Sequence, residues 1–313
     1  MGHRSKVWVA LATVYVIWGS TYLGIELTGE TIPPLFAVAV RFLCAGLLLA
    51  AFTWWRRGGD AFRVTRAELG AAVLVGALLP GANAVLFVAE QHVATGLSAL
   101  IIGSVPLWIV VLRSVNGDRP PAAALASVLV GFAGLALLVR PGGGTPLWAM
   151  LLVLCSSVMW AVGSYLSSRV PMPRDSIAAT TYEMLAGGLI LLPIGIAFTS
   201  PHPSHFSGRS IFGFVYLVTF GSVVGYTAYE WLLDNAPLGT VATYAYVNPV
   251  VAIALGALVL HESLTWTVGL GAILVLACVA VVVRQEEVPP EAEAMAAGAA
   301  GVPDQAAAGA PPR

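Results

Sequence analysis

The chain of 313 residues is strongly apolar: 58% of its residues are hydrophobic, only 10% are charged, and its mean hydropathy is +0.86. A soluble domain carries roughly 25% charged residues because water must wet its surface, so this composition excludes an ordinary soluble globule and predicts an outer surface that faces lipid. The net charge of −1 is not that of a basic nucleic-acid-binding protein, so no nucleic-acid partner is expected.

Ten apolar stretches are each long enough for a helix to cross a bilayer, which takes about 20 residues. In chain order they are Val7–Leu27, Pro34–Trp54, Ala67–Ala89, Thr95–Arg113, Ala122–Val139, Leu147–Ser167, Ile177–Thr199, Ile211–Leu232, Gly239–Leu260 and Thr265–Val283. The connecting segments are short, rich in Pro and Gly, and too small for a soluble catalytic domain. The sequence therefore predicts an all-α, polytopic membrane protein with ten transmembrane helices.

The two ends of the chain are predicted to lie outside the membrane. Residues 1–6 form a short cytoplasmic N-terminus, and Val7–Leu27 is interpreted as a retained helix because it is too long for a signal-peptide core and lacks a convincing cleavage site. Residues 285–313 are rich in Ala, Gly, Pro and Glu without apolar periodicity, which predicts a disordered cytoplasmic tail.

The Lys and Arg residues between the predicted spans indicate the orientation. With the N-terminus in the cytoplasm, eleven of these residues fall on the inner side and only Arg140 and Arg209 fall in outer loops. Short loops rich in Lys and Arg stay in the cytoplasm. We therefore expect a protein of the cytoplasmic (inner) membrane with both termini in the cytoplasm.

The sequence contains a tandem repeat with an offset of about 142 residues. The aligned positions are Trp18 with Trp160, Arg41–Gly46 with Glu183–Gly188, and Pro106 with Pro249. The two repeats, 7–140 and 141–284, each hold five predicted spans, so the second is predicted to cross the membrane upside down relative to the first. Such inverted repeats are typical of secondary transporters, with the substrate site near the midplane between the halves.

Two prolines lie deep in corresponding spans of the two repeats. Pro106 and Pro249 each remove a backbone donor and free the carbonyls of Ile102 and Ala245. Such carbonyls are tolerated in a membrane only where protein or water meets them, and paired interruptions point to a binding site. A simple packing kink stays open as an alternative, and the polar run before Pro249, which ends at Asn248, favours a cavity lining.

Arg41 lies about 10 Å below the outer end of the second span, at 1.5 Å per residue. An arginine at this depth is costly in lipid, so its side chain is expected to face the bundle interior with a partner. Glu26 and Glu90 could pair with it. Two interpretations stay open, a salt bridge that locks the outer gate and a cation that faces the substrate.

Three acidic residues are candidates for proton coupling. Glu183 occupies the place in the second repeat that Arg41 has in the first, Glu90 shares a helix face with Asn83, and Glu230 shares one with Tyr226. Because burial disfavours the charged form of a carboxylate, such groups can bind and release protons. Glu230 could instead lie in the cytoplasmic interface.

Several aromatic residues lie deeper than the interfacial belts where membrane Trp and Tyr usually gather. They are Trp18, Tyr22, Trp160, Tyr182, Tyr226 and Tyr244. A phenol at such depth needs a hydrogen-bond partner, and a group of such rings could enclose an amphipathic or cationic solute. Packing and interfacial roles stay open for each of them.

Six segments of the two repeats carry a resemblance to a known family: Ile17–Tyr22, Arg41–Gly46, Pro106, Ser222–Tyr226, Ala242–Val251 and His261–Leu264. They resemble EamA-type transporters of the drug/metabolite transporter superfamily, in particular its YedA-like group of bacterial inner-membrane proteins, and the likeness covers essentially Val7 to Val283. It implies ten helices in two inverted five-helix halves around a central cavity, with export or exchange of metabolites. The family's usual Gly-Glu pair after the ninth span is His261-Glu262 here, and the basic pair of phosphate-sugar antiporters is missing.

These observations predict a secondary transporter that exports small amphipathic metabolites or drugs by alternating access. Its expected partners are a small-molecule substrate, the lipid bilayer and protons as a candidate coupling ion, with no cofactor and no metal. Two alternatives remain. One is a membrane scaffold or sensor that transports nothing, and the other is a membrane-embedded enzyme, for which the sequence holds no metal or nucleophile motif.

Overall fold

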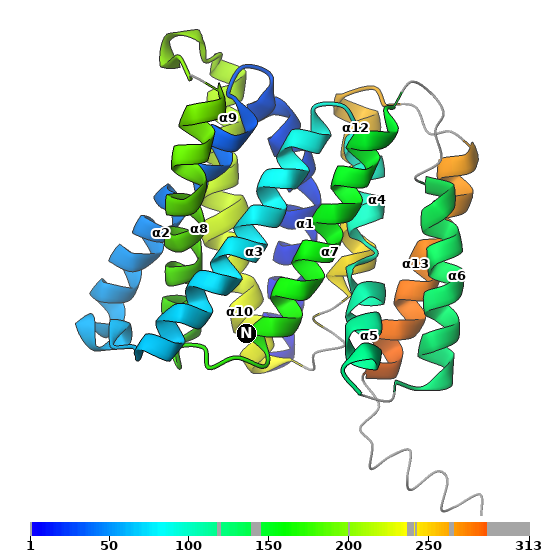
Figure 1. The fold of residues 1–313 in the computed structure, drawn as a ribbon, viewed down its shortest axis with the longest axis horizontal. Helices are drawn as coiled ribbons and strands as arrows, with labels where there is room; N and C mark the ends of the chain where they lie inside the picture. Colours follow the sequence, from blue (N-terminus) through cyan, green and yellow to red (C-terminus); the bar gives the residue numbers. More distant parts are fainter. Residues whose placement is uncertain are drawn as a thin grey trace, which may run out of the picture.

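The computed structural model is a bundle of helices over the residues that it describes, which are 2–117, 120–138, 145–199, 201–236, 241, 243–262 and 266–286 (Figure 1). The first repeat contains α1 (His3–Gly29), α2 (Pro34–Arg57), the short 3₁₀ helix η1 (Gly59–Phe62), α3 (Arg66–Glu90), α4 (Thr95–Ile102), α5 (Val105–Val115) and α6 (Ala122–Leu138). The second repeat contains α7 (Leu147–Ser167), α8 (Ser176–Thr199), η2 (Pro203–His205), α9 (Gly208–Tyr216), the π-helical segment η3 (Leu217–Val224), α10 (Gly225–Asn235), α12 (Tyr244–Val259) and α13 (Trp266–Glu286).

The helices have the lengths and the apolar character that a bilayer requires. Within the described residues, seven helical stretches are long and apolar enough to cross a membrane, and three shorter apolar helices add to them. Large apolar side chains on the outside of the bundle are open to the surroundings, with Leu129 exposed to 74% and Phe198 to 80%. Water would disfavour such a surface and lipid does not. The prediction of an all-α polytopic membrane protein with ten helical spans is confirmed.

The two repeats run in opposite directions through the bundle. In Figure 1, α1 begins at the end of the bundle that carries the label N, whereas α7 begins at the opposite end. The helix α13 ends at the same end at which α1 begins. Since each repeat holds an odd number of spans, this inversion follows directly from the connectivity.

Helix packing follows the repeat symmetry. Three pairs of equivalent helices pack against each other, namely α2 with α8, α4 with α12 and α6 with α13. The packing of α3 on α7 has its counterpart in the packing of α9 and α10 on α1. These pairs are those expected if one half is related to the other by a two-fold axis between α2 and α8.

Reciprocal contacts between α2 and α8 support this axis at the level of single residues. A Cβ atom built on Gly46 would lie 2.8 Å from Leu185 Cδ2, and one built on Gly188 would lie 2.7 Å from Leu43 Cγ. Adding the 142-residue offset to Leu43 and Gly46 gives Leu185 and Gly188, so the two contacts are equivalent by the repeat. Glycine at both positions is what lets the two helices approach so closely.

Three of the predicted spans are less regular than the sequence suggested. The predicted span Thr95–Arg113 is divided into α4 and α5, with Gly103 and Ser104 between them. The eighth span contains the π-helical segment η3. The ninth span is helical from Tyr244 as α12, and Gly239, where it was predicted to begin, lies outside the described residues. Of the predicted disordered tail, 285–313, residues 285 and 286 belong to α13, and the rest lies outside the described residues.

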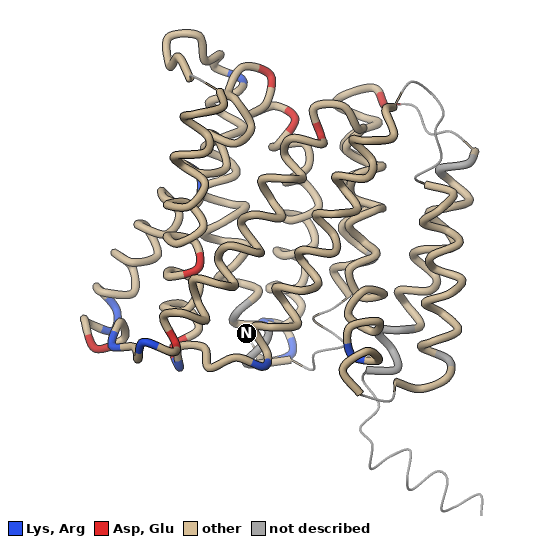
Figure 2. The backbone as a smooth tube through the Cα atoms, in the orientation of Figure 1, with Lys and Arg blue, Asp and Glu red and all other residues tan. Residues whose placement is uncertain are grey.

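Charged residues occupy the two ends of the bundle. Figure 2 shows that Lys and Arg gather at the end where α1 begins, while the opposite end is mostly acidic. At the first end, Arg57 forms an ion pair with Asp175, which joins the α2 terminus to the link before α8. At the opposite end, Arg209 Nε lies 3.1 Å from Glu30 Oε1.

Candidate functional site

A cavity lies between the two repeats near the middle of the spans. It encloses about 780 Å³ of empty space, including the part that is open to solvent. The predicted site residues that line it are Trp18, Tyr22, Arg41 and Asn83 from the first repeat and Trp160, Tyr226, Tyr244, Asn248 and Pro249 from the second. The cavity walls are therefore built by both halves.

The other predicted site residues lie elsewhere. Glu90 is only 2% exposed and does not line the cavity. The Tyr182 hydroxyl donates a hydrogen bond to the Phe62 carbonyl at 2.8 Å, beside the link between α2 and α3. Glu183 and Pro106 are also absent from the cavity wall. The side chain of Glu230 lies outside the described part of the chain.

Arg41 is the charged residue of the cavity wall. Its side chain comes from α2, is 3% exposed, and donates a hydrogen bond from Nε to Ser222 Oγ at 3.0 Å. Its Nη1 atom is buried and has no hydrogen-bond partner. A Cβ atom on Gly221 would lie 3.2 Å from Arg41 Nη2, so the glycine leaves room for the guanidinium. The expected pairing with Glu26 or Glu90 is not formed in the structure, since Arg41 makes no ion pair with any described residue.

The π-helical segment η3 brings Ser222 and Gly221 to the cavity. A π-helical turn widens the backbone and redirects its carbonyl groups, and such turns are common at functional sites. One carbonyl of this segment, that of Gly221, accepts a hydrogen bond from Trp18 Nε1 at 3.3 Å. A Cβ atom on Gly225 would lie 2.5 Å from Trp18 Nε1, so only glycine fits there without a shift.

Aromatic rings surround Trp18 on one side of the cavity. The Trp18 ring centroid lies 5.5 Å from that of Tyr226, 4.9 Å from that of Tyr229 and 5.2 Å from that of Tyr244. The contacts with Tyr226 and Tyr244 are edge-to-face, an arrangement that the quadrupoles of aromatic rings favour. These rings offer an apolar, electron-rich surface to a bound solute.

The helix interruptions of the two repeats lie against each other. A Cβ atom on Gly103, between α4 and α5, would lie 3.1 Å from the Ala245 carbonyl oxygen and 3.3 Å from Pro249 Cγ. The carbonyl that Pro249 frees thus faces the break in the first repeat. Asn248, one residue earlier, is 7% exposed, and its Oδ1 atom is buried without a hydrogen-bond partner.

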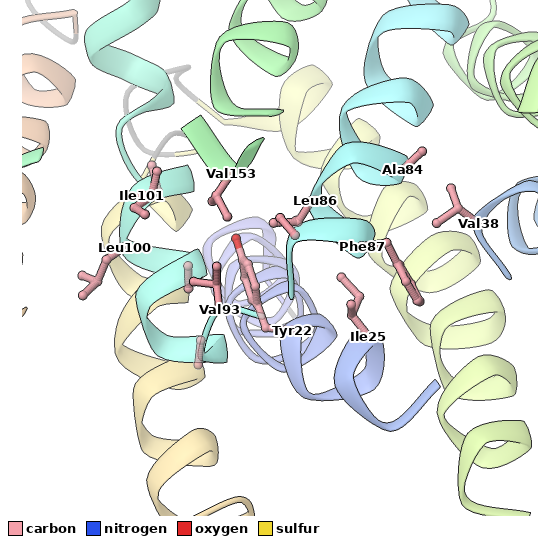
Figure 3. Close-up of a cluster of buried hydrophobic side chains, with 14 of the residues drawn as sticks. Tyr22, Ile25, Val38, Ala84, Leu86, Phe87, Val93, Leu100, Ile101 and Val153 are labelled. Atoms are coloured by element: carbon pink, nitrogen blue, oxygen red, sulfur yellow. The ribbon is translucent and has the colours of Figure 1, made fainter. Parts of the chain in front are cut away.

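Glu90 lies in a buried acidic group at the C-terminal ends of α1 and α3. Neither of its carboxylate oxygens has a hydrogen-bond partner, and Ser98 of α4 approaches it without reaching hydrogen-bond geometry. The titratable groups that act on it electrostatically are Tyr22 and Glu26 of α1 and Glu262, which follows α12. Figure 3 shows the ring of Tyr22 among apolar side chains of α3, α4 and α7.

Glu262 binds the N-terminus of α4, although it belongs to the other repeat. Its Oε1 accepts a hydrogen bond from the Thr95 amide at 2.7 Å, and its Oε2 accepts from the Gly96 amide at 3.2 Å and from the Thr95 hydroxyl at 3.1 Å. A carboxylate at this place satisfies amides that a helix leaves free and complements its dipole. The His261-Glu262 turn, where His261 has a φ of 56°, therefore joins the two halves near the cavity.

Sequence reasoning did not single out three small polar residues as part of the site. Thr21 and Ser156 line the cavity, and Ser222, quoted only for the family resemblance, accepts a hydrogen bond from Arg41. Ser156 donates to the Ala82 carbonyl at 2.7 Å, which fixes α7 on α3. Their positions at the depth of Trp18 and Arg41 were the available signal, but small hydroxyl residues are common throughout membrane helices.

The sequence matches the EamA-like transporter family twice, over residues 6–140 and 147–284. The inner membrane transporter YedA of Escherichia coli (strain K12), described as uncharacterized, is 37% identical over 253 residues, which cover 79% of this chain and 80% of that protein. An uncharacterized transporter of Archaeoglobus fulgidus is 25% identical and covers 88% of this chain and 96% of its own.

Further matches include a plant protein and a solved structure. A chloroplastic WAT1-related protein of Arabidopsis thaliana is 28% identical over 87% of this chain and 68% of its own length. A solved crystal structure superimposes with a TM-score of 0.63 at 21% sequence identity, covering 91% of this chain and 99% of that one. At this identity the structural match supports the fold alone.

Proposed function

Because the chain belongs to the EamA-like transporter family, and so is a multi-pass membrane transporter rather than an enzyme, we propose that it exports small amphipathic metabolites or drugs by alternating access. The observation that carries this proposal is the midplane cavity, whose walls come from two inverted halves. In such an arrangement, two related packings, each open to one side, can lie close in energy.

The lining of the cavity supports an amphipathic cargo. One part of the wall is aromatic, with Trp18, Trp160 and Tyr244, and another part is polar, with Arg41 and Asn248. A solute with an apolar body and one polar group can use both parts at once. Ligand sites in proteins commonly combine an apolar lining with a few placed polar groups.

We place the protein in the inner membrane with both termini in the cytoplasm and protons as the coupling ion. The inner-membrane location is supported by the YedA relative. The orientation is supported by the Lys and Arg residues at the end where α1 begins (Figure 2). The coupling is supported by Glu90, a buried carboxylate without a hydrogen-bond partner.

Flux through purified protein in liposomes tests transport. We expect wild-type vesicles to move members of a panel of aromatic and aliphatic metabolites, and Arg41→Ala to lower the flux by about tenfold or more, since a lost charge-assisted hydrogen bond costs ~1.5–3 kcal/mol. Arg209→Gln is the matched control, because this arginine pairs with Glu30 at the end of the bundle, away from the cavity.

Two outcomes would count against the proposal. A wild-type protein that is folded in the vesicles and moves no member of a broad panel would favour a scaffold or sensor. Normal flux in folded Arg41→Ala would remove Arg41 from the transport pathway while leaving transport itself in place. The protein can insert into vesicles in either orientation, and protease accessibility of an added terminal tag tells the two populations apart. Flux measured in each population gives the direction of transport.

A further inference from the structure

We infer that Arg41 is the binding group for one carboxylate of the transported solute, so that the cargo is a small organic anion with an aromatic or apolar body. This inference rests on the proposed transport function. It goes beyond it by assigning the charge of the cargo and the residue that selects it.

The guanidinium of Arg41 has donors left over after its contact with the protein. Its Nε is used by Ser222, 3.0 Å away, whereas Nη1 is buried without a partner. Arginine presents its donors in a planar fork that matches the two oxygens of a carboxylate. Ser222 therefore fixes one edge of the guanidinium, while Nη1 of this cavity-lining residue is left without a partner in the protein.

The protein supplies no counter-charge for Arg41 within its described residues. None of its ion pairs involves Arg41, and the titratable group that acts on Arg41 electrostatically is the Tyr226 phenol, which is neutral at ordinary pH. An arginine buried at membrane depth without a partner is costly. An anionic solute offsets this cost, and the gain is available only while the solute is bound.

The surroundings of Arg41 fit the rest of such a solute. Trp18 lies on the Gly221 carbonyl beside it, and Tyr244 packs edge-to-face on Trp18 at 5.2 Å. Asn248 contributes a second buried atom without a partner, the acceptor Oδ1, which suits a donor group on the solute. One anionic group, an apolar body and a hydrogen-bond donor therefore each meet a matching part of the wall.

The same geometry disfavours a cationic cargo. The aromatic rings alone could hold a cation over their faces, but Arg41 lines the same cavity and would repel it. Like charges that face each other in a poorly solvated site cost binding free energy. The charge of Arg41 thus decides between the two classes of solute that an aromatic cavity can accept.

Binding to the purified full-length protein tests this with three probes of similar shape. They are 3-phenylpropanoate, 3-phenylpropanamide and 3-phenylpropylamine, titrated by calorimetry at neutral pH in detergent. We expect the anion to bind on the order of tenfold to a hundredfold more tightly than the amide, because a charge-assisted hydrogen bond is worth that much, and the amine to bind most weakly.

Variants separate the role of the charge from that of folding. In Arg41→Gln, the preference for the anion over the amide should fall to about twofold or less, since the remaining hydrogen bond is neutral, while amide binding persists and shows that the cavity is intact. Arg209→Gln should keep the wild-type preference. An unchanged preference in Arg41→Gln, equal binding of all three probes by the wild type, or binding of none of them would overturn the inference.

Flux of the same three probes into proteoliposomes distinguishes failure of this inference from failure of the proposed function. Transport of the amide or the amine, with exclusion of the anion, would leave a transporter whose cargo is not anionic. Absence of flux for all three, with tight and selective binding of the anion, would leave an anion-binding protein without transport.

Discussion

At the residue scale, two buried charged residues in the described part of the chain, Arg41 and Glu90, lack the partners that buried charges usually have. Arg41 Nη1 is buried without a hydrogen-bond partner, and so are both carboxylate oxygens of Glu90. The sequence names Glu26 and Glu90 as candidate partners of Arg41, but in the structure Arg41 donates a hydrogen bond to Ser222 of the second repeat instead. Each group is therefore suited to its proposed role, Arg41 to binding an anion and Glu90 to binding a proton.

Glu90→Gln tests the proposed proton coupling. Keeping a negative charge on Glu90 is costly, because Glu26 and Glu262 are nearby and neither carboxylate oxygen has a hydrogen-bond partner, so the protonated form suits the packing seen in the structure. The glutamine variant imitates that form and cannot release a proton. We expect solute flux in proteoliposomes to continue but to lose its response to an imposed pH gradient.

The control for this prediction is Glu30→Gln, which alters a carboxylate that pairs with Arg209 at the surface. Its flux should keep the wild-type response to the gradient. If the Glu90→Gln protein still responds, Glu90 is not the coupling site, and Glu183 and Glu230 remain as the predicted alternatives.

At the element scale, helix irregularities coincide with the cavity. The α4–α5 break, the π-helical η3 and the proline in α12 all place backbone or small residues on its wall. The α4 terminus depends in addition on Glu262 of the other repeat. A movement that separates α4 from α12 must break this contact, so the contact stabilises the packing of the two halves seen in the structure.

Gly256→Ala should loosen that contact. The added Cβ would lie 2.4 Å from Glu262 Oε2 and 2.7 Å from Thr95 Oγ1, so the carboxylate must move away from α4. Loss of a helix cap costs ~0.5–2 kcal/mol, and thermal unfolding in detergent should show a lower midpoint. Glu262→Ala should have an effect in the same direction.

Gly269→Ala in α13 is the matched control, since nothing lies within 4 Å of its added Cβ. Its unfolding midpoint should be equal to or slightly above that of the wild type, because alanine favours a helix more than glycine does. A Gly256→Ala protein as stable as Gly269→Ala would show that the Glu262 contact contributes nothing to the stability of the bundle.

At the scale of the whole molecule, the inverted halves make α1 begin and α13 end at the same end of the bundle, where Lys and Arg gather (Figures 1 and 2). Two symmetric contacts across α2 and α8 mark the axis between the halves. In the proposed exchange between inward-open and outward-open packings, this end keeps facing one side of the membrane, and its Lys and Arg residues support the cytoplasm as that side.

Cysteine accessibility checks that orientation. In a background in which Cys44, Cys155 and Cys278 are replaced by alanine, Arg63→Cys and Arg174→Cys should react with a membrane-impermeant maleimide only from the cytoplasmic side. Ser204→Cys, in the exposed link between α8 and α9, should react only from the outside. Labelling of Arg63→Cys and Arg174→Cys from opposite sides would contradict the fold as well as the orientation.

The sequence by itself determined the helical membrane class, the inverted repeat and its 142-residue offset, because apolar length, the count of spans and aligned residues such as Trp18 and Trp160 are properties of the chain alone. Only the tertiary structure decided which polar groups meet. In the structure, Tyr182 and Glu183 do not line the cavity, Ser222 accepts a hydrogen bond from Arg41, and Glu262 binds the N-terminus of α4. Those contacts join residues more than a hundred positions apart, and they depend on helix rotation and on glycine-mediated approach, which hydrophobic periodicity does not encode.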